Sequence, residues 1–223
     1  MTMPEDIPAD YDGVQVVDSL SALFNAKMKA PVNCVLLPRK PEGDFDGLAR
    51  KLGGIFADRI EEKGLAMITA FGLAAKLRVR LAEMKGAFTP EERLALSVIR
   101  QDMRAAFEAG YDPALRIVGR YPHPMTGSVY DFHVDYVNRL NCCYAGPATE
   151  FVRNQDIRTS RSGEPVAAMG ARVFNVGTGN LWLHKKRDTD AEKRETGFLH
   201  RAPATQDGAP PRLVLISNLG PGG

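Results

Sequence analysis

The chain of 223 residues contains only four histidines, so their positions are informative. His133 and Asp135 lie two positions apart in the run Tyr-Asp-Phe-His-Val-Asp-Tyr. Because neighbouring side chains of a strand point to opposite faces, a strand here places both residues on the same face. An imidazole and a carboxylate on one face supply two ligands of a metal site. The alternative is that the two side chains simply hydrogen-bond to each other inside a barrel.

A third metal ligand has to come from elsewhere in the chain, and His200 is the favoured candidate. It lies in the strand-like run 197–201, whereas His184 immediately precedes a polar run that we expect to be a loop. Two histidines and one carboxylate leave the other positions on a metal open, which is typical of non-haem Fe(II) oxygenases. His184 as the third ligand and Asp131 as the carboxylate remain alternatives, because Asp131 would face the same side as Asp135.

Arg212 is a candidate for binding a carboxylate close to such a metal. It stands twelve residues after His200 and opens the apolar run Arg-Leu-Val-Leu-Ile. A guanidinium group pairs with a carboxylate through two parallel hydrogen bonds, so it can hold a dicarboxylic ligand. An arginine at the start of a strand is also common on protein surfaces, so this position alone does not decide the matter.

These residues carry a resemblance to a known family. Residues 113–218 resemble the Fe(II)/2-oxoglutarate-dependent oxygenase superfamily, whose core is a double-stranded β-helix. In that family an H-x-D motif and a late histidine bind iron, and His133, Asp135 and His200 match those positions. A later arginine grips the distal carboxylate of 2-oxoglutarate, and Arg212 matches it. The resemblance implies Fe(II) and 2-oxoglutarate as cofactors and hydroxylation as the reaction.

The same resemblance adds two cofactor-binding candidates and a narrower match. Asn141 and Tyr144 follow the iron-binding strand, as does Arg139, and we expect one of them to reach the co-substrate. The run His-Val-Asp…Arg-Leu-Asn-Cys-Cys-Tyr-Ala-Gly-Pro-Ala-Thr-Glu-Phe also resembles a bacterial family of unknown function. That narrower match implies no substrate, so a small molecule and a peptide both remain open.

The elements that must position these residues differ between the two halves of the chain. In the first half, two stretches rich in β-forming residues predict strands at 14–17 and 32–37. Apolar residues at helical spacing then predict helices at 45–60, 65–84 and 89–110. The last helix has a clear start, because Thr-Pro-Glu-Glu is a capping box, and Gly110 can close it. After Gly110, short apolar runs predict strands at 115–121, 129–136, 140–144, 149–152, 166–169, 172–176, 181–185, 197–201 and 212–217.

The fold expected from these elements is α+β, with a helical N-terminal region (1–112) packed on a C-terminal jelly roll or double-stranded β-helix (113–223). No linker rich in Pro, Gly or Ser separates the two, so we expect one structural unit. The longest uncharged apolar run, 64–75, has 12 residues, whereas a membrane span needs ~20. We therefore expect no membrane association.

The charge balance excludes one class of partner. The net charge is +2, from 29 basic and 27 acidic residues, which is not the signature of a nucleic-acid-binding protein. Residues 151–223 carry 11 basic and 7 acidic residues, an excess of four positive charges. Such an excess suits a small anionic ligand better than a polyanion, although it is also compatible with an ordinary solvated surface.

The three cysteines and two remaining residues favour structural roles. An odd number of cysteines, with Cys142 and Cys143 adjacent, predicts free thiols in a reducing compartment, and we expect the cytoplasm. The adjacent pair is expected to pack as small apolar side chains rather than act as nucleophiles. Trp182 is expected in the core, and His123, in a Tyr-Pro-His-Pro loop, is expected to be solvent-facing.

Two other functional classes remain open at this stage. A cupin-like protein could bind a metal or a small anion on the same three ligands without oxidative chemistry. An interaction module could use the helical region to dock a partner. Only the carboxylate-binding arginine distinguishes the oxygenase from the cupin-like binder.

Overall fold

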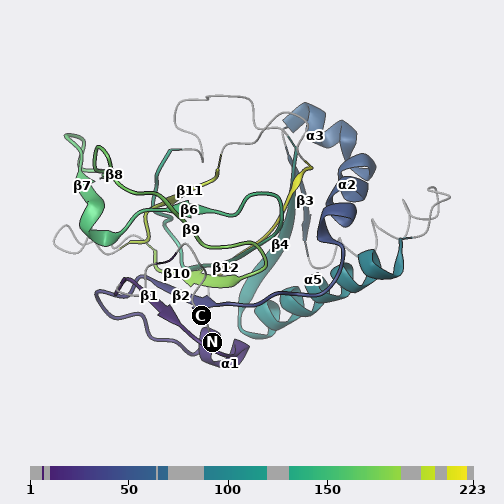
Figure 1. The fold of residues 1–223 in the computed structure, drawn as a ribbon, viewed down its shortest axis with the longest axis horizontal. Helices are drawn as coiled ribbons and strands as arrows, with labels where there is room; N and C mark the ends of the chain where they lie inside the picture. Colours follow the sequence, from purple (N-terminus) through teal and green to yellow (C-terminus); the bar gives the residue numbers. More distant parts are fainter. Residues whose placement is uncertain are drawn as a thin grey trace.

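A computed structural model describes residues 7, 11–63, 65–69, 88–119, 131–186, 197–203 and 210–219. Its centre is a seven-stranded sheet with the order β1-β2-β10-β5-β12-β4-β3 (Figure 1). Apart from the parallel pair β1 and β2, neighbouring strands of this sheet are antiparallel. In chain order its strands are β1 (Val14–Val16), β2 (Cys34–Leu37), β3 (Leu65–Thr69), β4 (Tyr111–Val118), β5 (Arg139–Ala145), β10 (Leu181–His184) and β12 (Arg212–Leu219).

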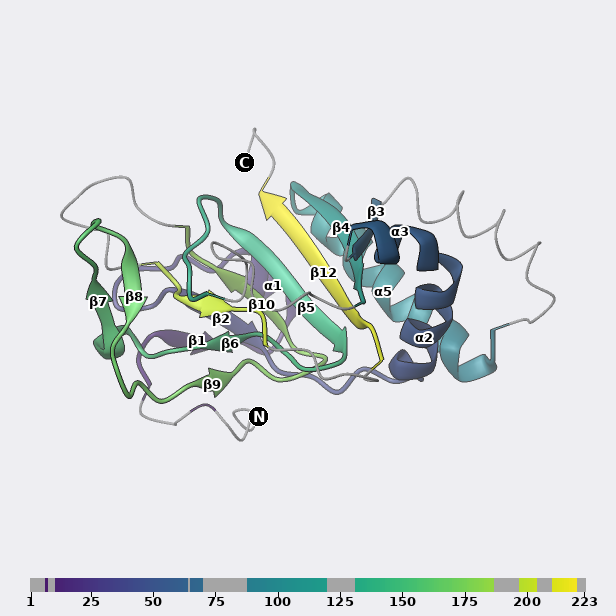
Figure 2. The ribbon, with the colours of Figure 1, turned by 90° about the horizontal axis from the view of Figure 1, so that it is seen from above.

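A second sheet of three short strands has the order β11-β6-β9. A separate hairpin, β7 and β8, lies at the end of the molecule farthest from α2 and α3 (Figure 2). The bounds of these elements are β6 (Glu150–Phe151), the 3-10 helix η1 (Asn154–Asp156), β7 (Ile157–Thr159), β8 (Pro165–Ala167), β9 (Phe174–Asn175) and β11 (His200–Arg201).

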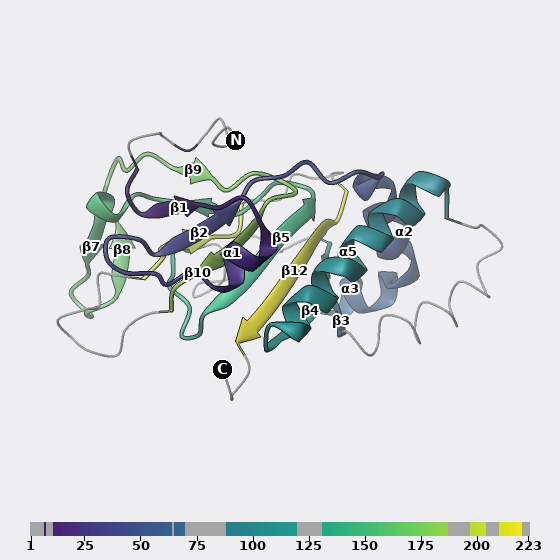
Figure 3. The ribbon, with the colours of Figure 1, turned by 90° about the horizontal axis from the view of Figure 1, so that it is seen from below.

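The helices α1 (Leu20–Phe24), α2 (Phe45–Ile55), α3 (Ala57–Lys63) and α5 (Pro90–Glu108) come from the first half of the chain. α5 lies beside β4 and β12 (Figure 3). A large apolar core joins α2 and α5 to one face of the seven-stranded sheet. Its buried members include Leu48, Leu52, Ile99, Met103 and Leu115. None of the helices in the described ranges is long and apolar enough to cross a membrane.

The predicted start and end of α5 are confirmed. The Thr89 hydroxyl accepts a hydrogen bond from the Glu92 backbone N–H (3.1 Å), and the Glu92 carboxylate accepts one from the Thr89 N–H (2.8 Å). Gly110 follows the helix with φ +87°, a left-handed conformation that favours glycine. The helix therefore begins at its capping box and ends at the glycine.

The other face of the seven-stranded sheet packs against the three-stranded sheet. Side chains from both sheets form a second core that includes Trp182 and Val214 from the large sheet and Phe151 and Phe174 from the small one, together with Phe198. Strand alternation separates the two cores, because β4 sends Leu115 and Ile117 toward the helices and Arg116 and Val118 the other way. The site described below lies on this second side.

The N-terminal region differs from the helical half expected from the sequence. Leu65–Thr69 is strand β3 rather than the start of a helix, with Ala66 and Ile68 buried and Met67 exposed. This alternation has the period of a strand, and pairing with β4 fixes it. The rest of that expected helix, residues 70–84, lies outside the described residues. The strands β1, β2 and β3 all join the large sheet, so the overall fold is a mixed α/β fold with more sheet than helix.

Two further elements differ in detail. The helix expected at 45–60 is interrupted at Phe56 and forms α2 and α3, and the paired Gly53 and Gly54 lower the helix propensity just before the interruption. The strand expected at 129–136 is reduced to a single bridge at His133, with 129 and 130 outside the described residues.

Candidate metal centre

His133 and His200 meet at an isolated antiparallel bridge between two segments that are far apart in the sequence. The His133 N–H donates to the His200 carbonyl (2.9 Å), and the His200 N–H donates to the His133 carbonyl (3.0 Å). This backbone pair holds the two imidazole rings with their centroids 4.7 Å apart. The bridge therefore does the positioning that the sequence assigned to a longer strand.

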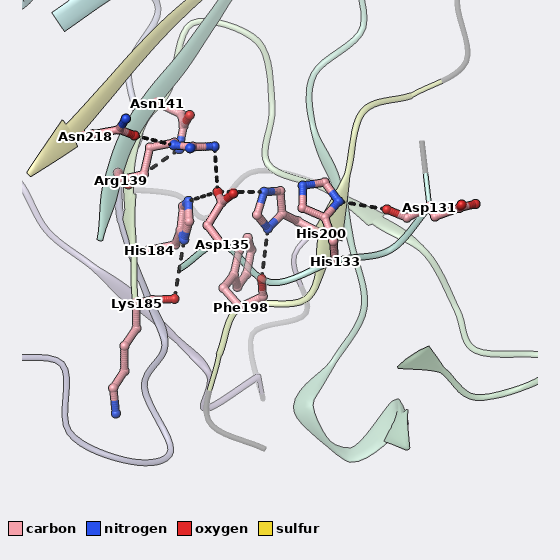
Figure 4. Close-up of polar contacts among 10 residues, drawn as sticks. All are labelled: Asp131, His133, Asp135, Arg139, Asn141, His184, Lys185, Phe198, His200 and Asn218. Carbon is pink, nitrogen blue, oxygen red and sulfur yellow. Dashed lines mark hydrogen bonds and ion pairs between the residues drawn. The ribbon is translucent and has the colours of Figure 1, made fainter. Parts of the chain in front are cut away.

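Asp135 completes a group of three potential metal ligands. One ligand atom each from His133, Asp135 and His200 lies within 4.8 Å of the other two. Figure 4 shows the three side chains converging, with the Asp135 carboxylate beside the His200 ring. The structure thus brings together the three residues that the sequence singled out.

Hydrogen bonds to backbone carbonyls fix the tautomer of both histidines. His133 Nδ1 lies 2.8 Å from the carbonyl oxygen of Asp131, and His200 Nδ1 lies 2.9 Å from that of Phe198 (Figure 4). A carbonyl only accepts hydrogen bonds, so each Nδ1 carries the proton and each Nε2 keeps its lone pair. This second hydrogen bond is what metal-binding histidines commonly have. Asp131 contributes its carbonyl while its side chain is exposed, so it is not the carboxylate of the group.

Burial favours the neutral form of His200 that a metal requires. Burial, and after it the neighbouring His184, lowers the pKa of His200 to about 3 against the opposing effect of Asp135. His200 is therefore an uncharged imidazole at neutral pH. Metal ions bind histidine in this form.

Three nitrogen atoms lie close to the Asp135 carboxylate. Its Oδ2 lies 2.8 Å from Arg139 Nη1, 3.1 Å from His184 Nε2 and 3.5 Å from His200 Nε2 (Figure 4). Burial alone would raise the pKa of Asp135. The interaction with His184 and the positive charge of Arg139 outweigh burial, so the pKa of Asp135 lies well below its ordinary range. Asp135 is therefore a carboxylate at neutral pH.

His184, the alternative third ligand, lies beside this carboxylate instead. It is fully buried, and its Nδ1 lies 3.4 Å from the Lys185 carbonyl oxygen. Its Nε2 is directed at Asp135 rather than grouped with His133. The sequence did not indicate this contact with Asp135, because it joins β10 to a segment without regular structure.

A partly open cavity of about 70 Å³ adjoins the two histidines. Most of its wall comes from the strands β4, β5, β10 and β12 of the large sheet. The lining residues are Arg116, Val118, His133, Arg139, Asn141, Thr149, Trp182, His200, Ala202, Arg212, Val214 and Ile216.

Arg212 and Asn141 line this cavity, as a ligand-binding role requires. Arg212 is buried, and its Nε donates to the carbonyl oxygen of Pro147 (2.8 Å). Gly146 has φ +76°, and a Cβ there would lie only 2.8 Å from Arg212 Cγ. The glycine therefore leaves space for the arginine stem, and the hydrogen bond to Pro147 orients its guanidinium group.

Tyr144 is not among the residues that line the cavity. Its hydroxyl donates to Asp102 Oδ2 (2.6 Å), and its ring stacks on Phe45 with centroids 5.5 Å apart. The cause is strand alternation, because β5 turns Asn141 toward the cavity and Tyr144 toward the helices. Asp102 also forms a two-pronged ion pair with Arg39, so Tyr144 belongs to a buried structural network.

Arg116 is a cavity residue that the sequence analysis did not single out. A charged residue between Leu115 and Ile117 in a strand is the signal that could have found it, since alternation turns it away from the helix-packed core. The positive charge of Arg116 affects the pKa of Arg139. The pKa of Arg139 is lowered chiefly by burial, Asp135 opposes this, and Arg116 lowers it further.

The remaining candidates have structural environments or lie outside the described residues. Cys34, Cys142 and Cys143 are free and buried, and burial raises the pKa of each thiol. Trp182 is 2% exposed, as expected for a core residue, but it also lines the cavity. His123 is outside the described residues.

Comparisons with known proteins give one family match and several similar structures. Residues 128–216 match a family described as a protein of unknown function (DUF1826). No curated protein matches the sequence. Among solved structures, the chain is similar to the dioxygenase for auxin oxidation 1 from Arabidopsis thaliana in complex with 2-oxoglutarate, with 11% identity over 93% of each chain and a TM-score of 0.46.

Two other solved structures are also similar to this chain. The dioxygenase for auxin oxidation in rice is 11% identical over 92% of this chain and 82% of that chain, with a TM-score of 0.40. A putative oxygenase from Shewanella oneidensis is 9% identical over 93% of this chain and 89% of that chain, also with a TM-score of 0.40. The family match agrees with the resemblance to a family of unknown function stated from the sequence.

Proposed function

We propose that this protein is an Fe(II)- and 2-oxoglutarate-dependent oxygenase of the hydroxylase type. The observation that carries the proposal is the grouping of His133, Asp135 and His200 at one cavity that Arg212 also lines. Two imidazoles and one carboxylate are the donor set of non-haem Fe(II) oxygenases.

The three side chains fit a divalent metal in their chemistry as well as their position. Each histidine has its Nδ1 proton engaged by a carbonyl, which leaves Nε2 as the only ring atom able to bind a metal. Asp135 supplies a negative charge that partly balances the ion. In this proposal His133, Asp135 and His200 hold Fe(II), and Arg139 and His184 keep the carboxylate ionised and oriented.

Arg212 is suited to bind the distal carboxylate of 2-oxoglutarate. A buried guanidinium group needs an anionic or hydrogen-bonding partner, and its Nε already donates to Pro147. Arg212 lines the cavity from β12, and a guanidinium group there can bind a carboxylate through two parallel hydrogen bonds. Asn141 lines the same cavity and offers a further donor.

When bound, Fe(II) would supply the chemistry by which dioxygen oxidises 2-oxoglutarate to succinate and carbon dioxide, with one oxygen atom going to succinate and the other to the hydroxylated substrate. The chain's own residues bind and orient the metal, the co-substrate and the substrate, and they exclude water from the cavity. Trp182, Val214 and Ile216 give the cavity an apolar part that limits access of water.

The decisive experiment is an anaerobic titration followed by visible absorption. Wild-type protein with Fe(II) and 2-oxoglutarate is expected to develop the metal-to-ligand charge-transfer band of the chelate. Arg212→Met is expected to retain iron and need at least about tenfold more 2-oxoglutarate for the band, since a charged hydrogen-bonding pair is lost. Arg104→Met is the matched control, because Arg104 is exposed and pairs with Glu108 on the surface of α5.

Each failure has a distinct meaning. Iron uptake by the wild type without the band would refute the oxygenase and favour a cupin-like metal-binding protein. No metal uptake at all would refute both proposals and leave the interaction module. A band that is equally strong in Arg212→Met would show that another residue holds the co-substrate.

A further inference from the structure

The cavity next to the candidate metal centre is unusually rich in positive charge. Arg139, Arg212 and Arg116 line it from the adjacent strands β5, β12 and β4. The only carboxylate that the described residues bring to these arginines as an ion-pair partner is Asp135, which pairs with Arg139. Three positive charges and one negative charge leave an excess of two. Such an excess in a partly buried site is costly unless an anion binds there.

Arg116 is the arginine without a partner. Arg139 donates to Asp135 and Asn218, and Arg212 donates to Pro147. The Nε of Arg116 is buried without a hydrogen-bond partner, and no carboxylate of the described residues forms an ion pair with it. Buried polar groups are almost always hydrogen-bonded, so this donor needs an explanation.

Trp182 adds a second buried donor to the same cavity. Its Nε1 is also buried without a hydrogen-bond partner, and the residue lines the cavity from β10. Two N–H groups without acceptors at one cavity indicate that a ligand with acceptor oxygens completes it. A carboxylate or a phosphate has such oxygens, and its negative charge would also give Arg116 an ion-pair partner.

The register of the strands separates Arg116 from the expected place of the co-substrate. Arg212 pairs with Val118, Val214 pairs with Arg116, and Asn218 pairs with Arg139 at the metal end. A dicarboxylate that reaches from the metal ligands to Arg212 therefore runs along β12. Arg116 lies on the neighbouring strand β4, to one side of that line.

We propose that the substrate is a small organic anion and that Arg116 binds its carboxylate or phosphate group. This inference rests on the proposed function, because Fe(II) and 2-oxoglutarate carry +2 and −2 charges and cancel, which leaves the excess of two positive charges for the substrate. The apolar side chains of Val118 and Ile216 line the same cavity and suit the carbon skeleton.

The test uses the fluorescence of Trp182, the only tryptophan of the chain, as a probe of the cavity. Protein loaded with Mn(II) and saturated with 2-oxoglutarate is titrated with inorganic phosphate, with propionate and with uncharged propionamide. We expect one or both anions to bind and propionamide to bind at least about tenfold more weakly. Whichever anion binds more tightly identifies the group that Arg116 recognises.

Arg116→Met and Arg116→Lys supply the matched variants. We expect Arg116→Met to weaken the anion at least about tenfold and to change the affinity for 2-oxoglutarate less than about twofold, whereas Arg116→Lys retains part of the anion binding. Melting curves establish that each variant is folded.

Several outcomes would overturn the inference. Equal anion binding by wild type and Arg116→Met would do so. A loss of 2-oxoglutarate binding in Arg116→Met as large as in Arg212→Met would instead make Arg116 a co-substrate contact. If wild-type protein takes up neither metal nor 2-oxoglutarate but binds an anion through Arg116, the anion site stands and the oxygenase proposal alone fails.

Discussion

Replacing Tyr144 by phenylalanine tests whether this residue stabilises the fold on the helix side of the sheet or takes part in the candidate site. The substitution keeps the ring that stacks on Phe45 and removes only the hydroxyl that donates to Asp102. A hydrogen bond to a charged group contributes about 1.5–3 kcal/mol. At about 2–4 °C per kcal/mol for a chain of this size, Tm should fall by about 3–12 °C.

The assay combines thermal unfolding with the anaerobic 2-oxoglutarate titration. The metal and 2-oxoglutarate affinities of Tyr144→Phe are expected to match those of the wild type, because the tyrosine faces the helices. Tyr136→Phe is the control, since Tyr136 is 74% exposed and should change neither property. A tenfold loss of 2-oxoglutarate affinity at unchanged Tm would refute the placement of Tyr144 on the helix side.

Three other outcomes follow from buried groups. Asp102→Asn should destabilise by about 3–5 kcal/mol in urea unfolding, because Arg39 is left without its ionic partner; a loss below about 1 kcal/mol would contradict this. Gly146→Ala should lower Tm and weaken 2-oxoglutarate binding, since its Cβ collides with the Arg212 stem; wild-type behaviour would show that the loop adapts freely. The three buried thiols should resist alkylation at pH 8 until the protein unfolds. Because burial raises their pKa, the unfolded chain loses protons first, so stability should fall as the pH rises from 8 to 10; a flat profile would argue against their burial.

The sequence predicted those features that depend on local chemistry. The Thr89 capping box and Gly110 located α5 because both act through hydrogen bonds and backbone conformation within a few residues. The spacing of His133 and Asp135 identified two of the three grouped side chains, and His200 was the third. In the structure a single bridge, rather than a strand, holds this arrangement together.

The predictions from the sequence were wrong where the pairing of distant strands determines the local structure. The run Leu65–Thr69 is short and apolar, so its periodicity alone could not exclude a helix, and only β4 beside it makes it a strand. Tyr144 could have been excluded, because it is three residues from Asn141 and an odd spacing places two strand residues on opposite faces. The contacts of His184 and Arg116 depend on which strands become neighbours, and no short pattern in the sequence specifies that order.

The central claim is that three side chains hold one ferrous ion, and anaerobic equilibrium dialysis with Fe(II) tests it most directly. The wild type should bind one ion per chain, and His133→Ala, Asp135→Ala and His200→Ala should each weaken binding by at least about a hundredfold. Arg104→Met, altered at an exposed position, should bind as the wild type does. A wild type that binds no iron, or three alanine variants that bind it as tightly as the wild type, would contradict the account.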